Sequence, residues 1–212
     1  MMPALRQTIV RHLEMLADLG PVTGPGSGTS HLKRAAVCLI VANEKPRPTL
    51  IITRRSSKLN AHAGQFAFPG GRVDVGETIE QAALRETQEE VGLTLTPADI
   101  LGRLDDYPTR SGYLITPLVA WLPDQDNAAA TMRANPDEVA AIYRIPLDDL
   151  EVPGSPEFVS IPESTQPVIR YPLLGTRIHA PSAALMYQLM EVAIHGRMTR
   201  VAHLEQPVWA WR

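Results

Sequence analysis

Residues 71–93 read GRVDVGETIEQAALRETQEEVGL, and this stretch contains the helix from which the rest of the chain can be interpreted. Thr78 is a suitable N-cap and Gly92 a suitable C-terminal stop, so we expect a helix over residues 78–91. Within it Glu86, Glu89 and Glu90 stand at i, i+3 and i+4, which places three carboxylates on one side of the helix. The apolar residues form a neighbouring stripe that can face a core.

The acidic side of this helix needs a compensating charge. Like charges one turn apart destabilise an isolated helix by roughly 0.2–0.5 kcal/mol per pair, and carboxylates near the C-terminus also meet the negative end of the helix dipole. A hard divalent cation such as Mg²⁺, which prefers oxygen ligands, supplies that charge well. The alternative is a solvated acidic face with Arg85 as the local counter-charge, and for the helix alone it is the simpler interpretation.

Fixed identities along the stretch favour the metal site. The pattern G-x5-E-x7-R-E-U-x-E-E-x-G-U, where U is apolar, is met by Gly71, Glu77, Arg85, Glu86, Glu89, Glu90, Gly92 and Leu93. It resembles the Nudix box, the signature of the Nudix hydrolases, although Thr87 stands where the box prefers an aliphatic residue. The resemblance implies an α/β fold, a Nudix-type α/β/α sandwich with a mixed sheet, and an enzyme, a diphosphatase acting on phosphorus-containing anhydrides.

The resemblance also implies roles for individual residues. Glu86 and Glu90 are the expected ligands of Mg²⁺ or Mn²⁺, and the backbone carbonyl of Gly70 is expected to complete the metal shell. Glu89 is a further ligand or an assisting base. Arg85 is expected to orient the carboxylates, and Glu77 to bond with Arg85 or brace the loop.

A second motif lies just upstream and narrows the substrate. Ile51-Ile52-Thr53-Arg54-Arg55-Ser56, Gly64 and Phe68-Pro69-Gly70-Gly71 resemble the signature L-L-T-x-R-[SA]-x3-R-x3-G-x3-F-P-G-G of the coenzyme A diphosphatase branch. This implies hydrolysis of coenzyme A or acyl-CoA to 3′,5′-ADP and (acyl-)4′-phosphopantetheine. Asn60 departs from the signature, since it occupies the position of the second basic residue. Another nucleoside diphosphate derivative, such as ADP-ribose or NADH, is therefore the alternative substrate.

The substrate-binding positions implied by this second motif are Arg55, Ser56, His62 and Phe68. Arg55 suits a phosphate contact, with solvation of a surface loop as the alternative. His62 could bond a phosphate or hold its own loop. Phe66 and Phe68 point to opposite faces if the segment is extended, and core packing is favoured for them over stacking on adenine.

Glu138 is an additional catalytic candidate from a later segment. It follows Asn135-Pro136-Asp137, in a region that resembles the late loop of the same branch. It is expected to act as a general base or an extra metal ligand, and a loop carboxylate before a strand is the alternative. A non-catalytic nucleotide-binding module ranks low, because such proteins commonly lose box glutamates and this chain has them all.

The remaining pattern divides the chain into three parts. Residues 1–30 are expected to form an N-terminal helix over 4–18 and a Pro/Gly linker, 31–200 the Nudix domain, and 201–212 a C-terminal tail. Strands are expected at 35–42, 49–53, 99–105, 113–122 and 138–145, with a last helix at 182–195. For residues 148–180 the sequence predicts neither secondary structure nor function.

Composition limits the partners. Twenty basic against 23 acidic residues give a net charge of −3, which argues against a nucleic-acid binder. No apolar run is long enough to span a membrane, and the N-terminus lacks a signal pattern, so a cytoplasmic protein without a membrane partner is expected. The lone Cys38 is expected to be buried and inert. We expect a small nucleotide substrate, and the N-terminal helix and Trp-bearing tail make a homodimer plausible.

Overall fold

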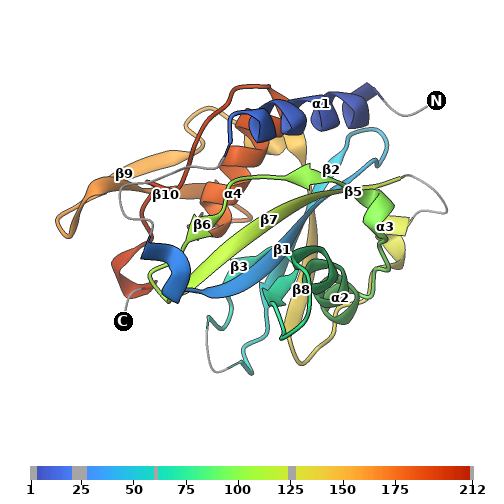
Figure 1. Cartoon of the computed structure of the whole chain (residues 1–212), viewed down its shortest axis with the longest axis horizontal. Helices are drawn as coiled ribbons and strands as arrows, with labels where there is room; N and C mark the ends of the chain where they lie inside the picture. Colours follow the sequence, from blue (N-terminus) through green and yellow to red (C-terminus); the bar gives the residue numbers. More distant parts are fainter. Residues whose placement is uncertain (1–3, 21–27, 60–61, 124–127, 211–212) are drawn as a thin grey trace. The chain divides into compact units, whose positions relative to one another are not determined.

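The computed structural model describes residues 4–20, 28–59, 62–123 and 128–210 (Figure 1). The chain forms two compact units. The central unit comprises Ala35–Leu101 and Leu118–Asp149, and the terminal unit comprises Met1–Arg34, Gly102–Pro117 and Leu150–Arg212. The domain limits expected from the sequence stay a prediction.

The central unit contains most of the residues of one sheet. Its strand order is β3-β2-β1-β7-β5, with β4 paired to β1 and β8 paired to β2. The strands are β1 (Lys33–Ala42), β2 (Thr49–Arg55), β3 (Phe66–Ala67), β4 (Gly70–Arg72), β5 (Ile100–Arg103), β7 (Tyr113–Leu122) and β8 (Val139–Pro146). The pairs β1–β2, β1–β4, β2–β3 and β2–β8 are antiparallel. Because β4 pairs with β1, Gly70 and Gly71, which precede the acidic helix, have fixed positions opposite Val37 and Ala36.

Helix α2 (Ile79–Val91) carries the acidic cluster of the central unit. The Thr78 hydroxyl caps it by accepting a hydrogen bond from the Gln81 backbone N, and the Gln81 side-chain oxygen accepts one from the Thr78 backbone N. Gly92 ends the helix in the left-handed region, at φ 68°. The helix and both of its ends are therefore as the sequence predicts.

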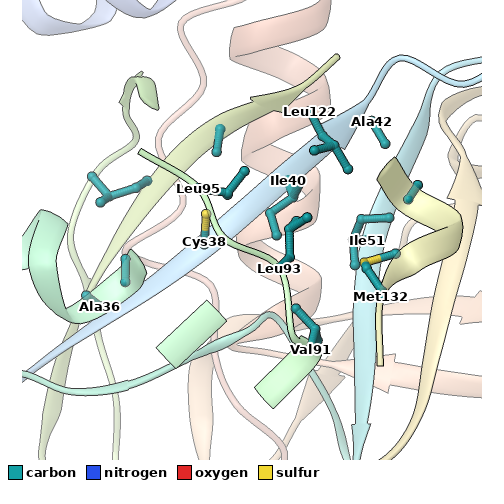
Figure 2. Packing of buried hydrophobic residues seen from close by; sticks show 14 of the residues in the cluster. Ala36, Cys38, Ile40, Ala42, Ile51, Val91, Leu93, Leu95, Leu122 and Met132 are labelled. Carbon is teal, nitrogen blue, oxygen red and sulfur yellow. The ribbon is translucent and has the colours of Figure 1, made fainter. Parts of the chain in front are cut away.

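The apolar side of α2 packs into the core of this unit (Figure 2). Ala82, Ala83 and Val91 join a buried cluster with residues of β1, β2 and β7 and with the segment after the helix. Figure 2 labels its members Ala36, Cys38, Ile40, Ala42, Ile51, Val91, Leu93, Leu95, Leu122 and Met132. Cys38 is fully buried, and burial raises the pKa of its thiol to about 12, which keeps it protonated and unreactive.

The terminal unit contains helix α1 (Ala4–Asp18), the helix formed by α4 (Ser182–Gln188) and η4 (Leu189–Ile194), the short 3-10 helices η1 (Gly28–His31) and η5 (Val208–Ala210), and a second sheet. Helix α1 buries Ile9, Leu13 and Leu16, as its helical spacing predicts, and contacts the π-helix η4 that continues from α4. A separate antiparallel sheet has the order β11-β10-β9. Its strands are β9 (Glu157–Ile161), β10 (Ser164–Leu173) and β11 (Thr176–His179). Strand β6 (Tyr107–Pro108) pairs with the first part of β7.

Two features differ from the expectations. The last helix, expected as one α-helix over 182–195, changes to π-helical geometry after Gln188. The sheet β9–β11 fills a region for which no element is expected.

Trp211 and the linker residues 21–27 lie outside the described residues, whereas Trp209 is half exposed and packs edge-on against His179. A search of the described helices for one long and apolar enough to cross a membrane finds none.

Candidate functional site

Arg85 is the centre of an ion-pair network on α2. Its Nε and Nη2 atoms donate to the two oxygens of Glu77, at 2.9 and 3.1 Å. Its Nη1 atom donates to Glu86 Oε1 at 2.9 Å and to Glu89 Oε2 at 3.0 Å. The Glu77 hydrogen bonds raise the pKa of Arg85, and the bond from Arg85 lowers the pKa of Glu77. Three carboxylates are thus held around one guanidinium.

Glu90 lies apart from this network, in a nearly dry environment. Its side chain is only 5% exposed, and its Oε2 atom accepts a hydrogen bond from the backbone N of Gly70 at 3.2 Å. Arg55 Nη1 lies 3.8 Å from Oε1. Burial raises the pKa of Glu90 to about 8, because Gly70 and Arg55 offset only part of the desolvation and the charges of Glu86 and Glu138 add to it. Arg55 and Gly70 therefore do not stabilise the ionised form of Glu90 enough to offset its burial, and an additional positive charge would lower its pKa.

Glu86 lies between these two environments. Burial also raises its pKa, while the hydrogen bond from Arg85 lowers it. Its carboxylate packs against Gly71, where a Cβ atom would lie 2.2 Å from Oε1. Gly71 pairs with Ala36 in the β1–β4 ladder, so the strand pairing and the missing side chain together make room for the carboxylate.

Glu138 and Ser56 meet at the end of β2. The backbone N of Ser56 donates to the Glu138 carbonyl at 2.8 Å. Glu138 is half-buried, and its negative charge contributes to the raised pKa of both Glu86 and Glu90. The structure therefore brings Glu138, which is 48 positions after Glu90 in the sequence, within electrostatic range of the acidic helix.

The other residues expected to bind substrate have different environments and do not form one cluster. Arg55 faces Glu90, and among the described residues its buried Nε atom has no hydrogen-bond partner. His62 is exposed, with a positive φ of 57°. Phe68 is buried, in agreement with core packing rather than stacking on a base. Asn60 lies outside the described residues.

The residues present fit a hard divalent cation. The side-chain donors of Glu86 and Glu90 are carboxylate oxygens, which Mg²⁺ and Mn²⁺ prefer. A cation beside Glu90 and Glu86 would stabilise the charged forms that burial disfavours. Within the described ranges no three His, Cys, Asp or Glu side chains form a ready-made metal cage, since Arg85 and Gly70 hold the carboxylates separately.

Sequence reasoning does not find the contact between Arg55 and Glu90. The two residues are 35 positions apart, and their meeting depends on how β2 and α2 pack on the same core. No spacing or composition signal marks it. The phosphate contact expected of Arg55 stays a prediction, and the structure adds a carboxylate neighbour within the chain.

Comparisons with known proteins identify the family of the chain. The model of the family described as NUDIX domain matches residues 32–161. An uncharacterized Nudix hydrolase NudL of Yersinia enterocolitica is 40% identical over 124 residues, which are 58% of this chain and 61% of that protein. The NudL protein of Pectobacterium atrosepticum is 38% identical over 148 residues, 69% of this chain and 71% of that one. The match to the Yersinia relative thus spans less than two thirds of its length.

A solved structure extends the likeness to most of the chain. The crystal structure of a MutT/nudix family protein from Enterococcus faecalis superposes with a TM-score of 0.54 and 15% identity, covering 94% of this chain and 76% of that one. At this identity the likeness concerns the fold. The α/β fold with a mixed sheet expected from the sequence is confirmed.

Proposed function

Because the chain belongs to the NUDIX domain family, we propose that it is a divalent-metal-dependent hydrolase of a diphosphate bridge. The favoured substrate is coenzyme A or an acyl-CoA, with 3′,5′-ADP and (acyl-)4′-phosphopantetheine as products. The observation that carries the proposal is the acidic array of α2, in which Arg85 holds three carboxylates beside a buried Glu90 of raised pKa.

The proposed division of labour follows the environments of the carboxylates. Glu86 and Glu90, with the backbone carbonyl of Gly70, would hold Mg²⁺ or Mn²⁺. The cation supplies charge neutralisation of the diphosphate, which otherwise repels a nucleophile. Glu89, which is half exposed, and Glu138, which is half-buried, are the two candidates for accepting a proton from the attacking water.

Arg85 and Arg55 act on these groups in different ways. Arg85 donates hydrogen bonds to three carboxylates and to the Arg72 carbonyl, so it fixes the orientation of the carboxylates. Arg55 has a buried Nε donor that finds no partner in the part of the chain that the structure describes, which suits a phosphate oxygen. A diphosphate bound there would lie next to the carboxylate of Glu90.

The choice of coenzyme A rests on the second motif, from Ile51 to Gly71. A panel of diphosphate compounds, each incubated with the purified chain and Mg²⁺ or Mn²⁺, tests it by product identification. We expect coenzyme A to yield 3′,5′-ADP faster than ADP-ribose or NADH is cleaved. If the preparation hydrolyses another compound and leaves coenzyme A intact, the proposed substrate is wrong, but the proposed enzyme class stands.

The presence of Asn60 favours the alternative, a nucleoside diphosphate derivative other than coenzyme A. A neutral amide at this position brings no charge to the 3′-phosphate that distinguishes coenzyme A from dephospho-coenzyme A. The substitution Asn60→Arg discriminates: a large gain on coenzyme A alone means that this position reads the 3′-phosphate. Equal rates on both compounds, before and after the change, favour ADP-ribose, NADH or a related derivative.

The proposed partners follow from the same site. They are small nucleotide derivatives in the cytoplasm, with neither nucleic acid nor membrane involved, and a homodimer stays a prediction. A non-catalytic nucleotide-binding role is the remote alternative. Turnover by the wild type that disappears in Glu89→Gln or Glu90→Gln, with folding retained, excludes it.

A further inference from the structure

Ser56 is buried at the end of β2, where a substrate contact is expected from the sequence. Only 4% of the residue is exposed. Its hydroxyl donates to the Pro136 carbonyl at 3.3 Å and accepts a hydrogen bond from the backbone N of Lys58 at 3.4 Å. A hydroxyl has one proton to donate. The donor of Ser56 is therefore committed to the chain itself.

Both hydrogen bonds that Ser56 donates lead to one segment, residues 133–139. The side chain reaches Pro136 and the backbone N reaches the carbonyl of Glu138 at 2.8 Å. An exposed ion pair between Lys58 and Asp137, 2.9 Å long, joins the same two segments but contributes little because water surrounds it. We call residues 133–139 the Glu138 segment.

The other end of the Glu138 segment is fastened to α2. The backbone N atoms of Arg133 and Asn135 donate to the carbonyls of Val91 and Glu90, both at 2.9 Å. Asn135 also orders the turn, since its Oδ1 atom accepts from the backbone N of Asp137 at 3.2 Å. The segment is thus fixed at one end to the turn that carries Glu90 and at the other to Ser56.

The pairing of β2 with β8 changes register at the same place. Arg54 is paired with Ala141, but Arg55 is paired with Val139, so Ala140 is an extra residue on β8. An irregularity of this kind redirects the residues beyond it, and it is common beside active sites. Ser56 and Glu138 are the next residues after the shift, and their backbone bond fixes how β8 begins.

We propose that Ser56 is a positioning residue, which with Asn135 fixes the Glu138 segment between β2 and α2 and so sets the place of Glu138 relative to Glu86 and Glu90. This inference rests on the proposed function, in which Glu138 assists the reaction. It replaces the substrate contact expected of Ser56. A positioning residue acts on kcat through Glu138, whereas a substrate-binding residue acts on KM.

A double-mutant cycle on the full chain tests this. Ser56→Ala alone is expected to lower kcat several-fold with KM changed less than twofold. In a Glu138→Gln background the same change is expected to have no further effect, because the group it positions is already gone. Effects that multiply, or a rise in KM with constant kcat, overturn the proposal.

Amide hydrogen exchange supplies a readout that needs no activity. Ser56→Ala and Asn135→Ala are each expected to speed exchange at Glu138 and Val139 by about five- to tenfold, the loss of one hydrogen bond. Asn135→Ser, which keeps a side-chain oxygen, restores slow exchange. Ser164→Ala is the matched control, since Ser164 makes a similar local bond to Gln166 in β10.

The two readouts separate the failure of this inference from the failure of the proposed function. Unchanged exchange in Ser56→Ala overturns the anchoring of the segment whether or not the chain is an enzyme. A wild type that hydrolyses no diphosphate contradicts the proposed function instead.

Discussion

A Cβ atom at Gly71 would lie 2.2 Å from Oε1 of Glu86, so the carboxylate fills the space that glycine leaves at this strand position. Gly71→Ala is therefore expected to displace Glu86, with a weaker affinity for Mn²⁺ and a loss of diphosphatase activity. Titration calorimetry and steady-state kinetics measure both. Gly154→Ala controls for a general loss of stability: alanine is strained at its φ of 83°, but no described atom lies within 4 Å of the Cβ position, so Mn²⁺ affinity is expected to stay unchanged. Equal Mn²⁺ affinity in wild type and Gly71→Ala contradicts the interpretation.

Arg85 orders its carboxylates by a fork of donors that lysine cannot reproduce. We expect Arg85→Lys to lower metal affinity or kcat by roughly 10–100-fold, the usual effect of losing a group that orients ligands. Arg47→Lys changes an exposed arginine paired with Asp149 and is expected to be neutral. If both variants behave alike in Mn²⁺ titrations and kinetics, the network has no orienting role.

The raised pKa of Glu90 makes stability depend on pH. An unfolded glutamate loses its proton near pH 4.3, whereas folded Glu90 keeps it until about pH 8. The folded state thus binds more protons between these values, and the contribution of Glu90 to stability falls as the pH rises through this window. In EDTA, Glu90→Gln is expected to gain thermal stability over the wild type from pH 5 to pH 8.5.

The melting temperature of both proteins across this pH range gives the measurement. Glu80→Gln, an exposed carboxylate on the same helix, is the control and is expected to follow the wild type. Melting curves of Glu90→Gln and wild type that stay parallel across the range are inconsistent with a buried, protonated Glu90.

Asp105 is buried in the terminal unit and forms an ion pair with Arg200, while Gln188 Nε2 donates to its other oxygen at 2.6 Å. Arg200→Leu leaves this carboxylate without its counter-charge, and we expect a loss of about 3 kcal/mol in the free energy of unfolding. Urea denaturation measures it. The double variant Asp105→Leu/Arg200→Leu should regain stability over the single one; a further loss instead would argue that the ion pair is not the cause.

Much of the secondary structure of the central unit can be predicted from short stretches of sequence. Thr78, Gln81 and Gly92 mark the ends of α2 within a few residues of sequence, so the helix and its acidic side are predictable. The strands over 35–42 and 113–122 are predicted by their apolar runs, because buried strands need few other signals. Glu138 is suggested by family resemblance alone.

Contacts between distant segments were not predictable in this way. The hydrogen bond from Gly70 to Glu90 exists because β4 pairs with β1 while α2 packs on the same core. The burial of Ser56 depends likewise on the register of β2 with β8. Residues 157–179 contain three prolines, at 162, 167 and 172, and many polar side chains, which is typical of a loop. They form strands because β10 buries Val168, Ile169 and Tyr171, which the sequence pattern does not indicate.

The central claim is that the carboxylates of α2 bind a divalent cation for diphosphate hydrolysis. Calorimetric titration of the folded protein with Mn²⁺, with and without coenzyme A, tests it most directly when Glu86→Gln is measured beside it. The account predicts saturable binding in the wild type that is weakened at least tenfold in the variant, as expected when a ligand of the ion is lost. Wild type and variant that bind Mn²⁺ equally, or that both show no binding heat under either condition, would contradict it.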